Sequence, residues 1–393
     1  MPVALALVQS QSFGCAWRLD EFSTKGEKMK SSWNAVISGA CLTGLLLVTG
    51  CSGKKEDQNT SSAAEAPKKE FSIGWSIYAG WMPWPYAEKS GILKKWADKY
   101  GIRINLVQVN DYVESVNQYT AGKLDGVTVT NMDALTIPAA GGKDTTAVIM
   151  GDYSNGNDGI VMKAGKSVKD LKGQTINLVE LSVSHYLLAR ALELNGMALS
   201  DVKTMNTSDA DIAAAFATPQ VKSVVTWNPM LGEIKKSGTE VFDSSKIPQE
   251  IQDLMVVSSA TLKANPDLGK ALVGAWFETM AMLQKGGPDA DAAVTEMARM
   301  SGTSVQNYKD QLKTTYFYYK PAEAAAYETG PDIAKHEDLV RQFSFSHGLF
   351  GPAATSVDAI GIEMPGNRVL GDKNNVKMRY DATFMQMAAN GKL

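Results

Sequence analysis

From residue 102 onward, short β-branched runs alternate with helix-forming runs, and this alternation restricts the fold more than any other feature of the chain. Residues 102–109 predict a strand, and the capping-box pattern of Asp111 and Glu114 predicts a helix directly after it. A second strand is expected at 126–130, with a helix starting at its end. Strands that alternate with helices pair in parallel and carry helices on both faces of the sheet, so the sequence predicts an α/β fold.

The same alternation continues in a second region. Residues 174–179 are expected to form its central strand, and the glycine-containing loop 151–159 is interpreted as the crossing into it. A calcium site is the alternative for that loop because it contains oxygen ligands, but the closing Glu of an EF-hand is missing. A strand at 254–258 is expected to return to the first region, and the sequence beyond it is mostly helical.

The length of the chain predicts two lobes. More residues follow position 70 than one compact core usually holds. We expect two doubly wound α/β lobes joined by a hinge. Lobe 1 would consist of residues 71–158 and 255–393, including the mostly helical C-terminal region, and lobe 2 of residues 159–254.

An aromatic-rich turn follows the first expected strand. Residues 71–77 alternate between apolar and small side chains, which predicts a strand, and glycine and proline residues end it. In open α/β sheets, ligands bind beyond the carboxyl ends of the strands, so Tyr78 and Trp81 are expected to contact a ligand. Trp227 follows a later expected strand in the same way, whereas Trp75, inside the first strand, is either a core or a pocket residue.

Polar side chains near the predicted strand ends complete the candidate ligand site. Asn131 and Asp133 directly follow one strand, where they either cap the next helix or face the ligand. His185, near the start of another helix, is either a pocket wall or a packed helix residue. The candidate ligand-binding residues are Trp75, Tyr78, Trp81, Asn131, Asp133, Asp158, Glu180, Ser184, His185 and Trp227.

The N-terminal region has the pattern of a cleaved leader. Met29 is a plausible true start, because Lys30 and an apolar run at 35–47 follow it and a small-residue site ends at Cys51. This site resembles the lipobox of bacterial lipoproteins, which implies lipidation of Cys51. A short transmembrane anchor is the alternative, but the apolar run is shorter than the about 20 residues that span a bilayer. Residues 1–50 are therefore expected to be absent from the mature protein, and 51–70 to form a flexible tether.

The remaining chain has no cysteine and a slightly acidic balance. All three cysteines lie at or before position 51, which excludes disulfides, thiol nucleophiles and cysteine metal sites beyond it. Of the 39 Lys and Arg and the 42 Asp and Glu residues, 4 and 3 precede Cys51, which leaves 35 and 39. This balance argues against nucleic acid as a partner.

The sequence offers little support for catalysis. It contains neither a Gly-x-Ser-x-Gly elbow nor a phosphate-binding loop, and its three histidines are too scattered for a zinc site. Ser184 and His185 are adjacent, so on a helix they diverge by about 100° and cannot act as a nucleophile and its base. We therefore expect no enzymatic activity, no catalytic residues, no metal and no cofactor.

The order of these motifs resembles that of a known family. The lipobox, the aromatic turn at 74–84, the run 119–126 before Thr130-Asn-Met-Asp133, and the run 170–173 before Ser184-His185 are together similar to nitrate/sulfonate/taurine-type ABC transporter substrate-binding proteins. The resemblance covers residues 71 to about 258. It implies a type II periplasmic-binding-protein fold and a periplasmic or cell-surface lipoprotein, expected to be a monomer, that delivers a small solute to a membrane permease and its ATPase.

The resemblance also bears on the ligand. The sequence at residues 156–159, 177–186 and 206–209 is most similar to that of the branch associated with urea carboxylase-type enzymes. This similarity implies urea or guanidine as the ligand. The candidate loops contain acids but no arginine, which favours a flat cation over an anion. A small anion such as taurine, another sulfonate or nitrate is the alternative, because helix N-termini also bind anions. A secreted α/β enzyme with an unrecognised site is a further alternative.

Overall fold

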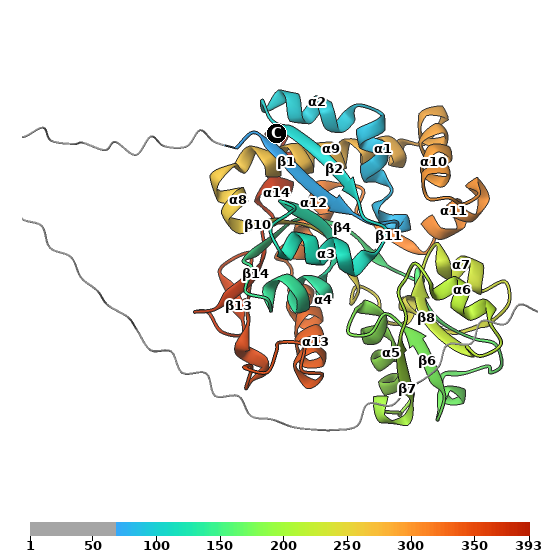
Figure 1. Cartoon of the computed structure of the whole chain (residues 1–393). Coiled ribbons are helices and arrows are strands. Elements are labelled where there is room, and N and C mark those ends of the chain that lie inside the picture. Colours follow the sequence, from blue (N-terminus) through green and yellow to red (C-terminus); the bar gives the residue numbers. More distant parts are fainter. Residues whose placement is uncertain (1–67) are drawn as a thin grey trace, which may run out of the picture. The chain divides into compact units, whose positions relative to one another are not determined.

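The computed structural model describes residues 68–393. The predicted lipidation site Cys51, the predicted leader and residues 51–67 of the predicted tether lie outside the described residues. Within residues 68–393, no helix is both long and apolar enough to cross a membrane. The described chain folds around two β-sheets, each flanked by helices, which confirms the predicted α/β class (Figure 1).

The larger sheet contains nine strands, ordered β13-β12-β14-β4-β10-β3-β1-β2, with β11 paired to β4. Its strands are β1 Glu70–Trp75, β2 Arg103–Gln108, β3 Gly126–Thr130, β4 Thr145–Ser154, β10 Gln252–Ser258, β11 Thr315–Phe317, β12 Gly361–Met364, β13 Arg368–Leu370 and β14 Val376–Tyr380. β1 pairs in parallel with both β2 and β3, as the alternating sequence predicts. β10 is antiparallel to both of its neighbours, β3 and β4, so the sheet is mixed and not purely parallel.

The smaller sheet contains five strands, ordered β7-β6-β8-β5-β9. Its strands are β5 Asp158–Met162, β6 Thr175–Leu178, β7 Lys203–Asn206, β8 Ser223–Trp227 and β9 Thr239–Asp243. The prediction that residues 174–179 form the central strand is wrong, because β8 is central and β6 lies second from the edge. The order of the strands along the chain does not give their order in the sheet, since β8 follows β6 in the chain but lies between β6 and β5.

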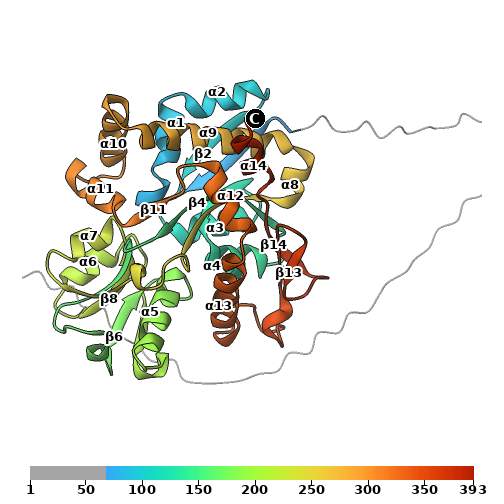
Figure 2. The same cartoon turned by 180° about the vertical axis from the view of Figure 1, so that it is seen from behind.

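Helices cover both sheets. They are α1 Pro83–Lys89, α2 Ile92–Lys99, α3 Tyr112–Thr120, α4 Asn131–Ala134, α5 Val183–Leu194, α6 Ile212–Ala217, α7 Met230–Ile234, α8 Ser259–Ala264, α9 Pro266–Lys285, α10 Pro288–Met300, α11 Val305–Leu312, α12 Pro321–Thr329, α13 Asp332–Ser346 and α14 Thr383–Ala389. Figures 1 and 2 show α5, α6 and α7 grouped with the small sheet, apart from α1, α2 and α9. The chain beyond β10 is mostly helical, as predicted, but β11–β14 also extend the large sheet.

Two short segments connect the sheets. Residues 155–157 lead from β4 into β5, and residues 244–251 lead from β9 back into β10. β4 and β10 are neighbours in the large sheet, so both connections leave it side by side. The predicted lobe boundaries, with residues 159–254 as lobe 2, describe units that would move separately. They remain a prediction.

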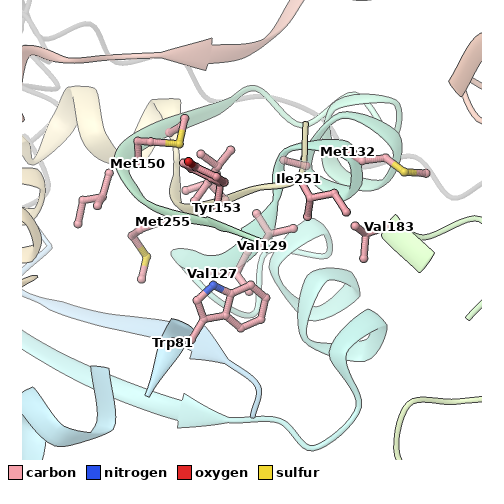
Figure 3. Packing of buried hydrophobic residues seen from close by; sticks show 14 of the residues in the cluster. Trp81, Val127, Val129, Met132, Met150, Tyr153, Val183, Ile251 and Met255 are labelled. Carbon is pink, nitrogen blue, oxygen red and sulfur yellow. The ribbon is translucent and has the colours of Figure 1, made fainter. Parts of the chain in front are cut away.

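The apolar core runs through both sheets. One cluster of buried residues includes Val127 and Val129 of β3, Ile251 of the second connection and Val183 of α5, and Figure 3 shows part of it around Trp81. All five residues of β3, Gly-Val-Thr-Val-Thr, are buried, so its threonines lie in the interior together with its valines. The core therefore continues to the ends of the strands, where the polar residues begin.

Candidate functional site

A small cavity lies where the strand ends of the two sheets meet. It is lined by Tyr78, Trp81, Tyr112, Thr130, Asp158, Val183, Trp227, Ile251 and Asp253. Its volume, measured as the space open to the centre of a water molecule, is about 20 Å³. That is enough for about one water molecule, so the walls must separate for a solute as large as guanidinium to enter.

The topology explains why these residues meet. Thr130 ends β3 and Trp227 ends β8, while Tyr112 and Val183 begin the helices that follow β2 and β6. Asp158 begins β5, which runs antiparallel to β8, and Asp158 is paired with Trp227. Both sheets thus present the carboxyl ends of their parallel strands to the cavity, which is where ligands bind in open α/β folds.

Four aromatic rings form a continuous wall. The ring centroids of Tyr78 and Trp81 are 5.1 Å apart, those of Trp81 and Tyr112 are 5.6 Å apart, and those of Tyr112 and Trp227 are 5.7 Å apart. The first and last pairs meet edge to face, with interplanar angles of 62° and 78°. In an edge-to-face pair the edge of one ring lies on the face of the other, and the electron-rich face of a ring attracts cations.

The cavity wall contains polar atoms without a partner. The Tyr78 hydroxyl, the Trp81 indole nitrogen and Oδ2 of Asp253 have no hydrogen-bond partner among residues 68–393, although all three side chains are buried. Buried polar groups are normally paired, and leaving one unpaired costs about 1–3 kcal/mol. These three polar atoms belong to side chains that line the cavity.

Asp158 is held at the cavity by the first connection between the sheets. Its carboxylate accepts a hydrogen bond from the Ser154 hydroxyl at 2.5 Å, and Ser154 in turn lies 2.7 Å from the Ser244 hydroxyl. Burial raises the pKa of Asp158 to about 7, the Ser154 hydrogen bond opposes this shift, and the nearby Asp133 charge adds to it. Asp158 is 3% exposed. Because its pKa is about 7, both its neutral and its charged form are present near neutral pH.

Asp133 lies behind the aromatic wall and orients Tyr112. Its Oδ2 accepts hydrogen bonds from the Tyr112 hydroxyl at 2.7 Å and from the Thr130 hydroxyl at 2.9 Å. Burial raises the pKa of Asp133 to about 6, and these two hydrogen bonds hold it down. Thr130 also caps α4 by accepting from the Asp133 backbone N–H. Asp133 is not among the residues that line the cavity, and its Oδ1 has no partner among residues 68–393.

A pair of carboxyls, Asp152 and Asp253, occupies the large-sheet side of the cavity. The two residues are directly opposite each other on β4 and β10. Burial and the neighbouring carboxyls of Asp152 and Asp158 raise the pKa of Asp253 well above its usual range. The cavity lining in the described part of the chain thus includes two aspartates and no Lys, Arg or His.

Several predicted site residues are not at the cavity. Trp75 packs into a separate apolar cluster with Met82 and Tyr308, so it is a core residue. Asn131 donates to the Glu250 carbonyl and to Glu337 and accepts from the Gln252 N–H, so its polar atoms are used within the fold. These two side chains are not among the lining residues.

His185 and its neighbours also lie outside the cavity wall. The Nδ1 atom of His185 accepts from the Leu181 N–H at 3.2 Å, and burial lowers the pKa of its ring to about 4. Ser184 follows Val183, and its buried hydroxyl has no partner among the described residues. Glu180 accepts from the Thr204 hydroxyl and lines a different groove, of about 480 Å³, between α3 and the small sheet.

The structure brings together four of the predicted ligand residues and five others. Tyr78, Trp81, Asp158 and Trp227 line the cavity, as do the unpredicted Tyr112, Thr130, Val183, Ile251 and Asp253. Tyr112 and Val183 carry a signal that sequence reasoning could have used, since each is the first residue of a helix that follows a strand. Residues 68–393 contain no group of three or more His, Cys, Asp or Glu side chains placed to hold a metal ion.

Comparison with known sequences finds partial matches. Residues 91–285 match the family described as NMT1/THI5 like. A binding protein of Brucella abortus (strain 2308) is 34% identical over 104 residues, which are 26% of this chain and 32% of that protein. The taurine-binding periplasmic protein of Escherichia coli (strain K12) is 25% identical over 179 residues, which are 44% of this chain and 55% of that protein. The matches thus span about a third to a half of these relatives.

Solved structures share the fold at low identity. The alkanesulfonate-binding protein from Xanthomonas axonopodis pv. citri gives a TM-score of 0.62 at 18% identity, over 72% of this chain and 95% of that one. The periplasmic nitrate-binding protein from Synechocystis PCC 6803 gives 0.62 at 14% identity, over 83% and 90%. The desulfurization enzyme DSZB gives 0.50 at 15% identity, over 71% and 93%, so the fold alone does not decide between binding and catalysis. The chain therefore has the fold of the periplasmic binding proteins, and its residues 91–285 are similar to the NMT1/THI5-like family.

Proposed function

We propose that this protein is the extracytoplasmic solute-binding component of an ABC importer and that its solute is a small nitrogen-rich cation of the guanidinium type. The observation that carries the choice of a cation is the composition of the cavity. Two buried carboxyls, Asp158 and Asp253, and four aromatic rings line it, and none of the lining residues in the described chain is basic.

The energetics of burial support a cation. An ionised carboxylate without a partner in a low-dielectric interior costs several kcal/mol, so Asp158 and Asp253 are unfavourable as bare anions. A guanidinium ion would pair with a carboxylate through parallel hydrogen bonds and place its flat face on an indole or phenol ring. An anion in the same position would add a like charge.

The transport role rests on the fold and on the relatives. Two sheets joined by adjacent short connections suit a hinged pair of lobes that closes on a solute and then presents it to a membrane permease. The taurine-binding relative and the nitrate-binding and alkanesulfonate-binding structural neighbours are named as binding proteins. Lipidation at Cys51, proposed from the lipobox, would keep the protein at the membrane surface.

A small anion is the second candidate, and one feature of the site favours it. The first residue of the twelve-residue helix α5, Val183, lines the cavity, and helix N-termini carry partial positive charge. Relatives and structural neighbours named for taurine, sulfonate and nitrate fit this alternative. Asp158 and Asp253 would have to be protonated for such a ligand to bind.

Calorimetric titration of the purified protein with guanidinium, urea, taurine and nitrate tests the proposal. We expect guanidinium to bind, and Asp158→Asn to weaken this binding by on the order of 100-fold, because it removes a buried charge partner. Neutral urea would lose only about 1 kcal/mol in the same variant. The matched control is Asp98→Asn, which changes an exposed acid of α2 paired with Lys94. Tight binding of taurine or nitrate without binding of guanidinium would reverse the assignment.

A further inference from the structure

The carboxyl pair next to the cavity has one member at the cavity wall and one behind it. Asp253 lines the cavity, whereas Asp152 does not, and the two occupy opposed positions on antiparallel strands. Side chains at opposed positions point to the same face of a sheet, with Cβ atoms about 5 Å apart. Both oxygens of Asp152 and Oδ2 of Asp253 have no hydrogen-bond partner among residues 68–393.

The surroundings of Asp152 hold its carboxyl in place. Gly80 lies directly against it, since a Cβ atom added to Gly80 would come within 2.7 Å of both carboxyl oxygens. On the other side of β4, Asp152 is opposed by Phe317 of β11. The Asp152 side chain is fully buried, so it cannot turn toward solvent and be hydrated when it is ionised.

No cation among the described residues compensates this pair. Several titratable groups shift the pKa of Asp152 or Asp253, or have their own pKa shifted by Asp152. All of them are acids, namely Asp158, Tyr78, Tyr308, Tyr318 and Tyr319. Burial raises the pKa of Asp152 to about 7, with the Asp158 charge adding to the shift. Two adjacent carboxyls that cannot both be ionised share a proton between them.

We propose that Asp152 is a positioning residue that keeps a proton on the Asp152–Asp253 pair, and that a bound cation replaces this proton. The inference rests on the proposed function. In this exchange the O–H bond of the protonated carboxyl breaks, its electron pair stays on the carboxylate oxygen, and the proton passes to a buffer base. The ion then supplies the positive charge that the proton had supplied, so the charge of the pocket is nearly the same with and without solute.

This exchange gives the site a particular selectivity. A neutral molecule such as urea cannot replace a proton, so it gains nothing from the pair. A cation competes with protons, so its affinity falls by up to about tenfold for each pH unit below the pKa of the pair. Asp152 thus contributes to ligand selection without touching the ligand.

Proton release measured by calorimetry tests the inference in the unaltered protein. Guanidinium is titrated at pH 7 in two buffers with different ionisation enthalpies, and we expect release of up to about one proton per ligand bound. If guanidinium binds with no proton release, the exchange does not occur and the inference is wrong, while the proposed function stands. If guanidinium does not bind at all, the proposed function fails and the replacement of the proton by a cation fails with it, and a ligand-free measurement decides separately whether Asp152 keeps a proton on the pair.

The variant Asp152→Asn supplies that second measurement. Removing the second carboxyl lets Asp253 ionise more easily, so proton release on guanidinium binding should fall, and the affinity should vary less between pH 6 and 8. In the ligand-free protein, the decrease in Tm as the pH rises through about 7 should be smaller than in the unaltered protein. Asp98→Asn, on the surface, should change neither quantity. Unchanged proton release and an unchanged pH profile of Tm in folded Asp152→Asn would assign the titration to Asp158 and overturn the inference.

Discussion

Each of the four rings around the cavity has a ring neighbour on at least one side. Trp227 stands at the small-sheet end of the row, where its ring contacts that of Tyr112. Tyr112 is in turn fixed by its hydrogen bond to Asp133. A change at Trp227 should therefore alter the cavity surface without disturbing the other three rings.

We expect Trp227→Ala to weaken guanidinium binding by about 1–2 kcal/mol, because a ring face next to a desolvated cation is lost. The ring is buried, so a loss of stability is expected as well, and Trp227→Phe, which keeps an aromatic face, should recover part of the affinity. Calorimetry and thermal denaturation measure the two effects separately. Trp276→Phe, at a buried tryptophan outside the cavity lining, is the control and should leave the affinity unchanged. Full affinity in folded Trp227→Ala would rule out an aromatic clamp.

At the scale of single elements, helix α3 delivers Tyr112 to the cavity. Its N-cap is Asp111, whose side chain accepts from the Glu114 N–H at 2.9 Å. The same carboxylate accepts from the Ser208 hydroxyl, on the small-sheet side, at 3.0 Å. One residue therefore both starts the helix and contacts the facing part of the chain.

Asp111→Ala should lower the free energy of unfolding by about 1 kcal/mol, since an N-cap is lost. Asp111→Asn should retain most of that stability because asparagine caps helices equally well. Urea denaturation of both variants gives the comparison. An alanine variant as stable as the unaltered protein would show that the cap contributes nothing.

Elements with a strong local pattern could be predicted from the sequence. β1, β3 and α3 were recognised because β-branched alternation and a capping box mark them locally. The short strands β12 and β13 were missed because three or four residues carry no clear periodicity. The position of β8 at the centre of its sheet depends on pairing between distant segments, which no local pattern reports.

The candidate site was predictable in part for the same reason. Tyr78, Trp81 and Trp227 directly follow or end predicted strands, so the rule about strand ends located them. Asp253 was missed because it precedes the apolar run of β10, and the reversed direction of that strand brings its beginning to the cavity edge. Trp75 was ambiguous, and its side chain enters the core cluster around Met82.

At the scale of the whole molecule, buried acids make stability depend on pH. Burial raises the pKa of Asp133 to about 6 and those of Asp158 and Glu337 to about 7. Such groups titrate near about 4 in an unfolded chain. A carboxyl with a raised pKa stabilises the folded state fully below its unfolded pKa, and this contribution is lost as the pH rises through its folded pKa.

We therefore expect the Tm of the ligand-free protein to fall as the pH rises from about 4 to about 7. Below about pH 4, acids with a lowered pKa act in the opposite sense, as at Glu296, whose pKa is held at about 2 by hydrogen bonds from Arg299 and Lys89. Thermal denaturation across this range checks the curve. Glu337→Gln should reduce this fall, and a Tm that rises steadily from about pH 4 to about pH 7 would contradict the assignment.

The adjacency of the two connections between the sheets has a mechanical consequence. A rotation of one sheet against the other would take place about an axis near residues 155–157 and 244–251, and atoms move in proportion to their distance from such an axis. Asp152, Asp158 and Asp253 flank these connections, so their spacing should change little as the walls open. Groups farther from this axis would move more, so opening would separate contacts at the rim first, while the three carboxyls proposed to select the solute would keep their arrangement.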